Sequence, residues 1–135
     1  MTLLAAYMVA LALGGMAFFS FAVAPVAFTR LGQAEAGTFI RAMFRVYYPV
    51  MAGLSALAAI AAWDFWLSLG LAVIAGLFLW LNFDLMPRAN RLRDQELAGD
   101  AEAGRAFARL HRESVVVNYL QMAALAGLFW LLFQA

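Results

Sequence analysis

The sequence contains neither cysteine nor lysine, and His111 is its only histidine. Without cysteine, the chain can form neither a disulfide framework nor a cysteine zinc site. A single histidine excludes bis-histidine haem ligation and a multi-histidine metal site within one subunit. Charge is also scarce, since only 13% of the 135 residues are charged and the net charge is +1. This balance gives no reason to expect a nucleic-acid partner.

The usual signatures of an enzyme are missing as well. The sequence has no cysteine nucleophile, no supported serine–histidine–acid arrangement and no glycine-rich phosphate loop after a strand. Its methionines are scattered over all the apolar segments, which favours packing over copper binding. The sequence therefore predicts no catalytic residue, no metal ligand set and no cofactor.

Apolar residues dominate what remains, because 67% of the chain is hydrophobic. A soluble domain of this length cannot bury so much apolar surface, since small domains have small cores. Four apolar runs account for the excess, and their lengths suit a bilayer core of roughly 30 Å. We therefore predict one domain over residues 1–135, an all-α integral membrane four-helix bundle. Its predicted spans are 2–28, 46–62, 66–86 and 114–133.

The arginines decide the predicted orientation. Three lie in residues 29–45 and six in residues 88–113, whereas both chain ends and the turn at Asp64 have none. Arginine-rich loops stay on the cytoplasmic side of a membrane. Segments 29–45 and 88–113 are therefore expected in the cytoplasm, and both termini on the periplasmic or extracellular side. Abundant alanine, with arginine in place of lysine, indicates a GC-rich bacterium and hence its inner (plasma) membrane.

Proline and glycine mark the expected helix ends. Pro25 is expected to end or kink the first span, and Pro87 to close the third. In the segment 29–45, Gly32 and Gly37 are expected to break the chain. In the segment 88–113, glycines at 99 and 104 predict two short helices with a break between them.

The two halves of the sequence follow the same order. In each, a long span ends at a proline, and an arginine-rich loop leads through Phe-x-Arg into the return span. The two Phe-x-Arg sequences are Phe39-Ile40-Arg41 and Phe107-Ala108-Arg109. Two parallel repeats, related by an axis along the membrane normal, explain this order. Any protein with an even number of spans and cytoplasmic loops also produces it, so both interpretations stay open.

Polar residues gather at one depth of the predicted bundle. On the fourth span His111, Ser114, Asn118 and Gln121 lie within an arc of about 80° at 100° per residue. Ser20, Tyr47, Tyr48 and Asn82 lie at similar depth on the other spans. The expectation is a polar layer in the cytoplasmic half, facing the bundle interior. Interhelical hydrogen bonding, a ligand pocket and a proton or ion path all remain open as its purpose.

Two further sets of residues invite a specific interpretation. His111 is expected either to be structural, bonded to a loop carbonyl or to Asp84, or to meet a ligand entering from the cytoplasm. Arg105, Arg109 and Arg112 form a basic face that suits anionic lipid headgroups. Pairing within the helix, of Glu102 with Arg105 or of Arg109 with Glu113, is the alternative for this face.

Several sequence pieces together resemble the transmembrane-protein-205-like family of small four-span membrane proteins. They are Phe18-Phe19-Ser20-Phe21 with Pro25, Phe44-Arg45-Val46-Tyr47-Tyr48-Pro49, Asn82 to Pro87, and Leu110-His111-x-x-Ser114-x-x-x-Asn118. The last of these is the most specific. The resemblance implies an α-helical membrane bundle with no established reaction.

The leading hypothesis is a non-enzymatic membrane protein that binds a small ligand or a lipid, or serves as a transport-associated or accessory subunit. In that case Ser20, Tyr47, Tyr48, Asn82, His111, Ser114 and Asn118 are the candidate ligand-binding residues. The alternative is a haem-, porphyrin- or copper-handling protein with His111 as its single ligand. The bilayer and anionic lipid headgroups are the expected partners, and a homo-oligomer or a larger membrane complex is left open.

Overall fold

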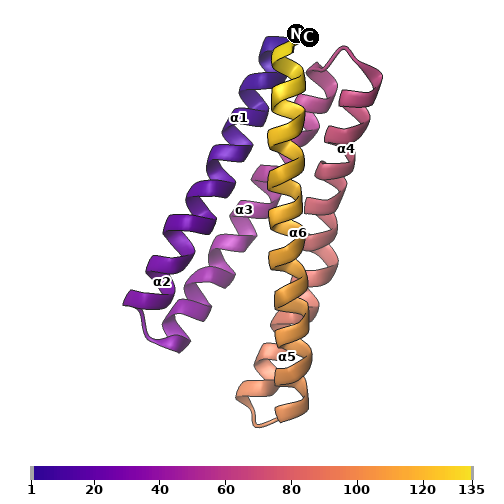
Figure 1. Cartoon of the computed structure of the whole chain (residues 1–135). Coiled ribbons are helices and arrows are strands. Elements are labelled where there is room, and N and C mark those ends of the chain that lie inside the picture. Colours follow the sequence, from indigo (N-terminus) through magenta and orange to yellow (C-terminus); the bar gives the residue numbers. More distant parts are fainter. Residues whose placement is uncertain (1, 135) are drawn as a thin grey trace.

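Helices account for nearly all of residues 2–134, which are those that the computed structural model describes. The chain runs through α1 (Thr2–Phe18), η1 (Phe19–Val23), α2 (Ala24–Arg30), α3 (Gln33–Ala61), α4 (Phe65–Trp80), η2 (Leu81–Leu85), α5 (Met86–Leu97) and α6 (Ala101–Gln134). The segments η1 and η2 are π-helical and continue the helices on either side of them. Four long rods therefore lie side by side (Figure 1).

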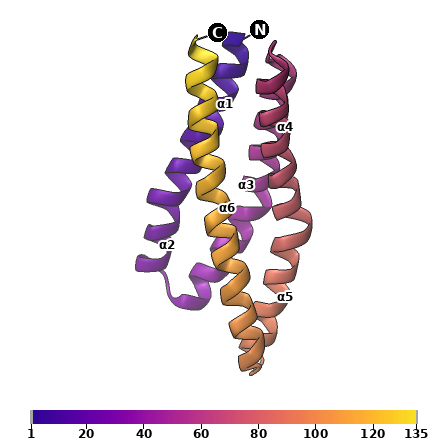
Figure 2. The same ribbon diagram turned by 45° about the vertical axis from the view of Figure 1, so that its right-hand side comes forward.

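The rods are long and apolar enough to cross a membrane, with 29, 29, 33 and 34 residues. At about 1.5 Å per residue each exceeds the roughly 30 Å of a bilayer core. The chain is thus an all-α four-helix bundle of the multi-pass membrane type, as the sequence predicts. Both termini and the turn at Asp64 lie at one end, the terminal end (Figures 1 and 2). The turns after Arg30 and Leu97 form the other, the arginine end.

Neither proline that was expected to close a span does so. The helix continues past Pro25 to Arg30, and past Pro87 to Leu97. A proline ring collides with the carbonyl four residues back and offers it no N–H. In both helices a widened π-turn ends two residues before the proline, η1 (Phe19–Val23) before Pro25 and η2 (Leu81–Leu85) before Pro87. The helix ends expected at Pro25 and Pro87 are therefore both absent, and a wide turn precedes each proline instead. A kink at Pro25 stays a prediction.

The equal placement of the two π-turns favours the repeat hypothesis, since hydrophobic patterning alone does not generate them. The backbone N–H of Ala24 reaches the carbonyl of Phe19, and that of Met86 reaches Leu81, each five residues back. Ser20 and Asn82 hold the second position of their respective π-turns. The two halves thus share a local distortion as well as an order of elements.

The loops at the arginine end are shorter than predicted. Gly37 and Gly104 lie inside α3 and α6, where they break nothing, and only Leu31 and Gly32 separate α2 from α3. The break at Gly99 is present, with a φ of 109° that favours glycine. The segments expected as cytoplasmic loops are therefore mostly helical extensions of the spans.

Small residues let the helices approach closely in the core. Ala5, Ala12 and Ala58 are fully buried, and a Cβ at Gly15 would lie only 2.7 Å from Cε of Met51. Large apolar side chains point outward instead, among them Ile60 at 76% and Phe83 at 74% exposure. Such an inverted surface suits lipid as the solvent.

Asp64 organises the tight turn at the terminal end. Its carboxylate accepts hydrogen bonds from the backbone N–H groups of Trp66 and Leu67, both at 3.0 Å. The hydroxyl of Ser68 donates to the carbonyl of Ala59 at 2.7 Å and so ties α4 to the end of α3. The turn therefore depends on a side-chain cap as well as on packing.

We expect Asp64→Ala to lower the free energy of unfolding by about 1 kcal/mol, because two N–H groups lose their acceptor. Asp64→Asn keeps an acceptor oxygen and should retain most of the stability. Unfolding of detergent-solubilised protein with increasing dodecyl sulfate measures both variants. Equal losses in the two variants would contradict the capping role.

Candidate functional site

Three polar side chains from three different segments meet inside the bundle. The hydroxyl of Tyr47, on α3, donates to Oδ1 of Asn118 on α6 at 2.8 Å. Nδ2 of the same asparagine donates to Oγ of Ser20, on η1, at 3.0 Å. These residues form the interior triad. The expected approach of Ser20 and Tyr47 to Asn118 is therefore observed, at atomic distances.

Aromatic rings surround the triad. The ring of Phe19 lies 4.7 Å from that of Tyr47, and Phe44 and Phe78 lie within 6.3 Å of it. In such apolar surroundings each polar atom needs a partner from another helix. The asparagine amide both accepts and donates, so it satisfies two helices at once. This arrangement fits interhelical bonding, the first of the three purposes that the sequence leaves open.

The other predicted members of the polar layer lie nearby but do not join the triad by hydrogen bonds among residues 2–134. Tyr48 is buried and stacks on Phe44, with ring centroids 4.9 Å apart. The hydroxyl of Ser114 is satisfied within its own helix, donating to the carbonyl of His111 at 2.7 Å. Asn82 is half-buried. The layer is thus a triad with neighbours rather than one connected network.

His111 is exposed, and its ring stacks on Phe107 with centroids 5.9 Å apart and an interplanar angle of 21°. The suggested hydrogen bond to Asp84 is wrong, because that carboxylate pairs with Arg88 at 2.8 Å, one turn along the same helix. Within the described part of the chain, no three histidine or acidic side chains lie close enough together to hold a metal ion.

Two further buried polar side chains, Gln121 and Ser55, are not among the candidate ligand-binding residues. Gln121 is 2% exposed, and its Nε2 donates to the carbonyl of Ile74 at 3.4 Å. Its Oε1 and the hydroxyl oxygen of the fully buried Ser55 have no hydrogen-bond partner among the described residues. The face shared with Asn118 already indicated that Gln121 points inward. Nothing in the sequence distinguished Ser55 from the apolar residues around it.

The arginines divide into paired and unpaired groups. Arg41 on α3 bonds the carboxylate of Asp94 at 2.9 Å and the carbonyl of Asn90 at 3.3 Å, which joins α3 to α5. Arg93 pairs with Glu96 at 2.6 Å on α5. Together with the ion pair of Arg88, these contacts neutralise the charges of three arginines at the arginine end.

The α6 arginine face, Arg105, Arg109 and Arg112, is exposed and makes no ion pair with residues in the described range 2–134. The alternative pairings with Glu102 and Glu113 are not formed there. Because helical residues advance by about 100°, the three arginines fall within about 60° of one another. This arc lies opposite the buried stripe of α6, Ala103, Ser114, Gln121, Leu125 and Leu132.

We expect Tyr47→Phe to lower the free energy of unfolding by about 0.6 kcal/mol, the mean value of an interhelical hydrogen bond in membranes. Asn118→Leu removes both bonds and should cost about 1–2 kcal/mol. Tyr48→Phe is the matched control, since this neighbouring hydroxyl makes no hydrogen bond among the described residues. Dodecyl sulfate unfolding tests the order, and a Tyr48→Phe loss as large as that of Tyr47→Phe would refute the role of the triad.

Comparison with known proteins places the chain in a family. Residues 7–98 match a family described as "Domain of unknown function (DUF4149)". No curated protein and no solved structure matches the chain. The resemblance to the transmembrane-protein-205-like family stays a prediction, and its most specific piece, from Leu110 to Asn118, lies outside the matched residues. Since the match covers more than half of the chain, the protein belongs to the DUF4149 family.

Proposed function

We propose that this protein is a non-enzymatic lipid-binding protein of a bacterial inner membrane, which holds anionic phospholipid headgroups on the α6 arginine face. The observation that carries the proposal is the exposed, unpaired state of Arg105, Arg109 and Arg112 beside arginines that are paired. Guanidinium groups bind phosphate through paired hydrogen bonds. Each arginine near an anionic membrane surface contributes about 1 kcal/mol.

The α6 arginine face lies on the same side of α6 as side chains that face the lipid. Continuing along the same side of α6, Val116 and Leu120 follow the arginines at helical spacing and are 51% and 64% exposed. Apolar side chains on this side face the lipid tails. The arginines therefore stand above the part of the bilayer that α6 already contacts, where the headgroups of those lipids lie.

Height along the helix separates the three arginines. Taking Ser114 as the edge of the hydrocarbon core, a rise of 1.5 Å per residue places Arg112 about 3 Å, Arg109 about 8 Å and Arg105 about 14 Å beyond it. The headgroup layer is only about 5–8 Å thick on each side. Two arginines thus reach the headgroups, and Arg105 stands above them.

The proposal requires that the arginine end face the cytoplasmic leaflet. In support of it, all nine arginines lie at or near that end, in α2, α3, α5 and α6. Reporter fusions test the orientation: an alkaline phosphatase fused to the C-terminus should be active, and one inserted at Gly99 inactive. The opposite pattern would overturn it.

The headgroup proposal predicts graded losses. Arg109→Gln and Arg112→Gln should each weaken the binding of phosphatidylglycerol about fivefold, as about 1 kcal/mol per arginine implies. Arg105→Gln is the matched control on the same face, with an expected loss below about twofold, because solvent and salt screen it. Native mass spectrometry of detergent-solubilised protein, titrated with phosphatidylglycerol and with phosphatidylcholine of the same chains, measures the affinities. Unchanged affinity in both Arg109→Gln and Arg112→Gln would contradict the proposal, and an equally large loss in Arg105→Gln would contradict the height assigned to Arg105.

A further inference from the structure

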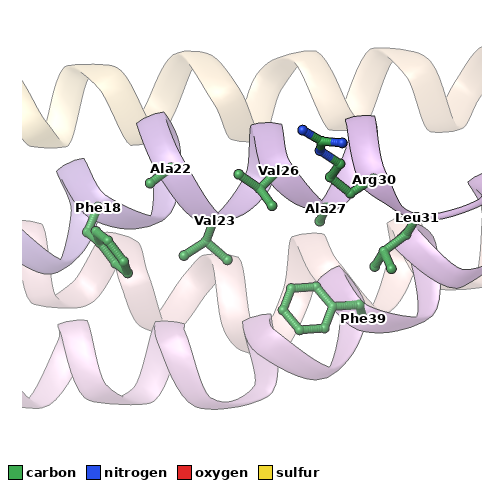
Figure 3. A pocket seen from close by; sticks show the side chains of 8 residues that line it. All are labelled: Phe18, Ala22, Val23, Val26, Ala27, Arg30, Leu31 and Phe39. Atoms are coloured by element: carbon green, nitrogen blue, oxygen red, sulfur yellow. The ribbon is translucent and has the colours of Figure 1, made fainter.

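A shallow apolar groove runs along the outside of the first rod, beside α3 (Figure 3). Its volume is about 370 Å³, within the range of ligand sites. The small residues Ala22 and Ala27 line it together with the larger Phe18, Val26 and Phe39, which are 40–67% exposed. The groove is thus lined by both small and large apolar side chains.

The lining surface of the groove is apolar throughout, and a charged group stands only at its arginine end. Arg30, the last residue of α2, lines it at the arginine end, and in Figure 3 its side chain reaches back along α2 in the direction of Val26. Every other lining residue is apolar. Arg30 makes no ion pair with the described residues, from Thr2 to Gln134. A guanidinium at the mouth of an apolar groove complements a molecule with an anionic head and a hydrocarbon tail.

The length of the groove matches the depth of one leaflet. From Phe18 to Arg30 a helix rises about 18 Å. Half of a bilayer core measures roughly 15 Å. With Arg30 at the interface, Phe18 therefore lies near the bilayer midplane, where an acyl chain ends. A partner helix would bury a longer stretch than this and would not need a cation at one end.

We propose that this groove binds one acyl chain of an anionic phospholipid, whose phosphate is held by Arg30. The site is separate from the α6 arginine face and does not depend on it. The π-turn η1 contributes to it, because Ala22 lies in the widened turn and the groove continues past Pro25 into α2. The groove would thus select lipids by their acyl chains as well as by their headgroups.

The site predicts a preference for long acyl chains that depends on its lining. Native mass spectrometry should show dioleoyl phosphatidylglycerol binding to the unmodified protein at least about fivefold tighter than the dihexanoyl form, since hydrocarbon burial supplies the difference. Ala22→Leu adds three carbons to the lining of the groove and should reduce this preference. Ala10→Leu, an equal addition on an exposed position of α1 outside the groove, is the control and should leave it unchanged.

Arg30→Gln tests the head of the site. It should weaken dioleoyl phosphatidylglycerol about fivefold, the factor for one arginine. Phosphatidylcholine should lose less, because its choline cation offsets the charge of the phosphate. An unaltered chain-length preference in Ala22→Leu would overturn the proposal, as would a dimer of this chain that excludes lipid from the groove. Arg112→Gln should keep the chain-length preference. A loss confined to the groove variants would therefore refute the headgroup face and support the groove, and the reverse pattern would do the opposite.

Discussion

Hydrocarbon offers no hydrogen-bond partner to a backbone, and this constraint governs the path of the whole chain. Three prolines lie within long helices, yet none of them ends one. At Pro25 and Pro87 the turn widens, and the N–H groups of Ala24 and Met86 find carbonyls five residues back. A break at either place would leave several backbone groups unsatisfied, each at a cost of several kcal/mol. A widened turn therefore costs less free energy than a break in the helix.

The same constraint explains the arrangement of polar side chains. Asn118 satisfies Tyr47 and Ser20 together, so one side chain on α6 fixes its distance and rotation relative to two other rods. Small residues bring those rods close enough for so short a contact. The buried oxygens of Gln121 and Ser55 lack such partners among the described residues. The triad thus joins three segments at one level by hydrogen bonds between side chains, and this contact specifies how those helices are paired.

The number and class of the helices could be predicted because apolar length is a local property of the sequence. The helix ends could not be predicted, because Gly104 and Pro87 weaken a helix only locally. The turns on either side of them keep the helix continuous. Depth in the membrane and helical periodicity correctly predicted that Ser20, Tyr47 and Asn118 lie close together. They failed for His111, which is exposed although it shares a face with Asn118 and the buried Ser114. Such limits are set by tertiary packing, which no single helix encodes.

Because α6 is one unbroken helix, the number of residues between its buried stripe and its arginines fixes the rotation and height of the arginines relative to the bundle. Its 34 residues carry the buried stripe and the arginines on one rigid rod. Inserting one residue between Arg112 and Ser114 would turn the arginines by about 100° and raise them by about 1.5 Å relative to the bundle. Side-chain chemistry would be unchanged, but the positive charge would face a different sector of the bilayer. Along this helix, residue count is therefore as strictly constrained as residue identity.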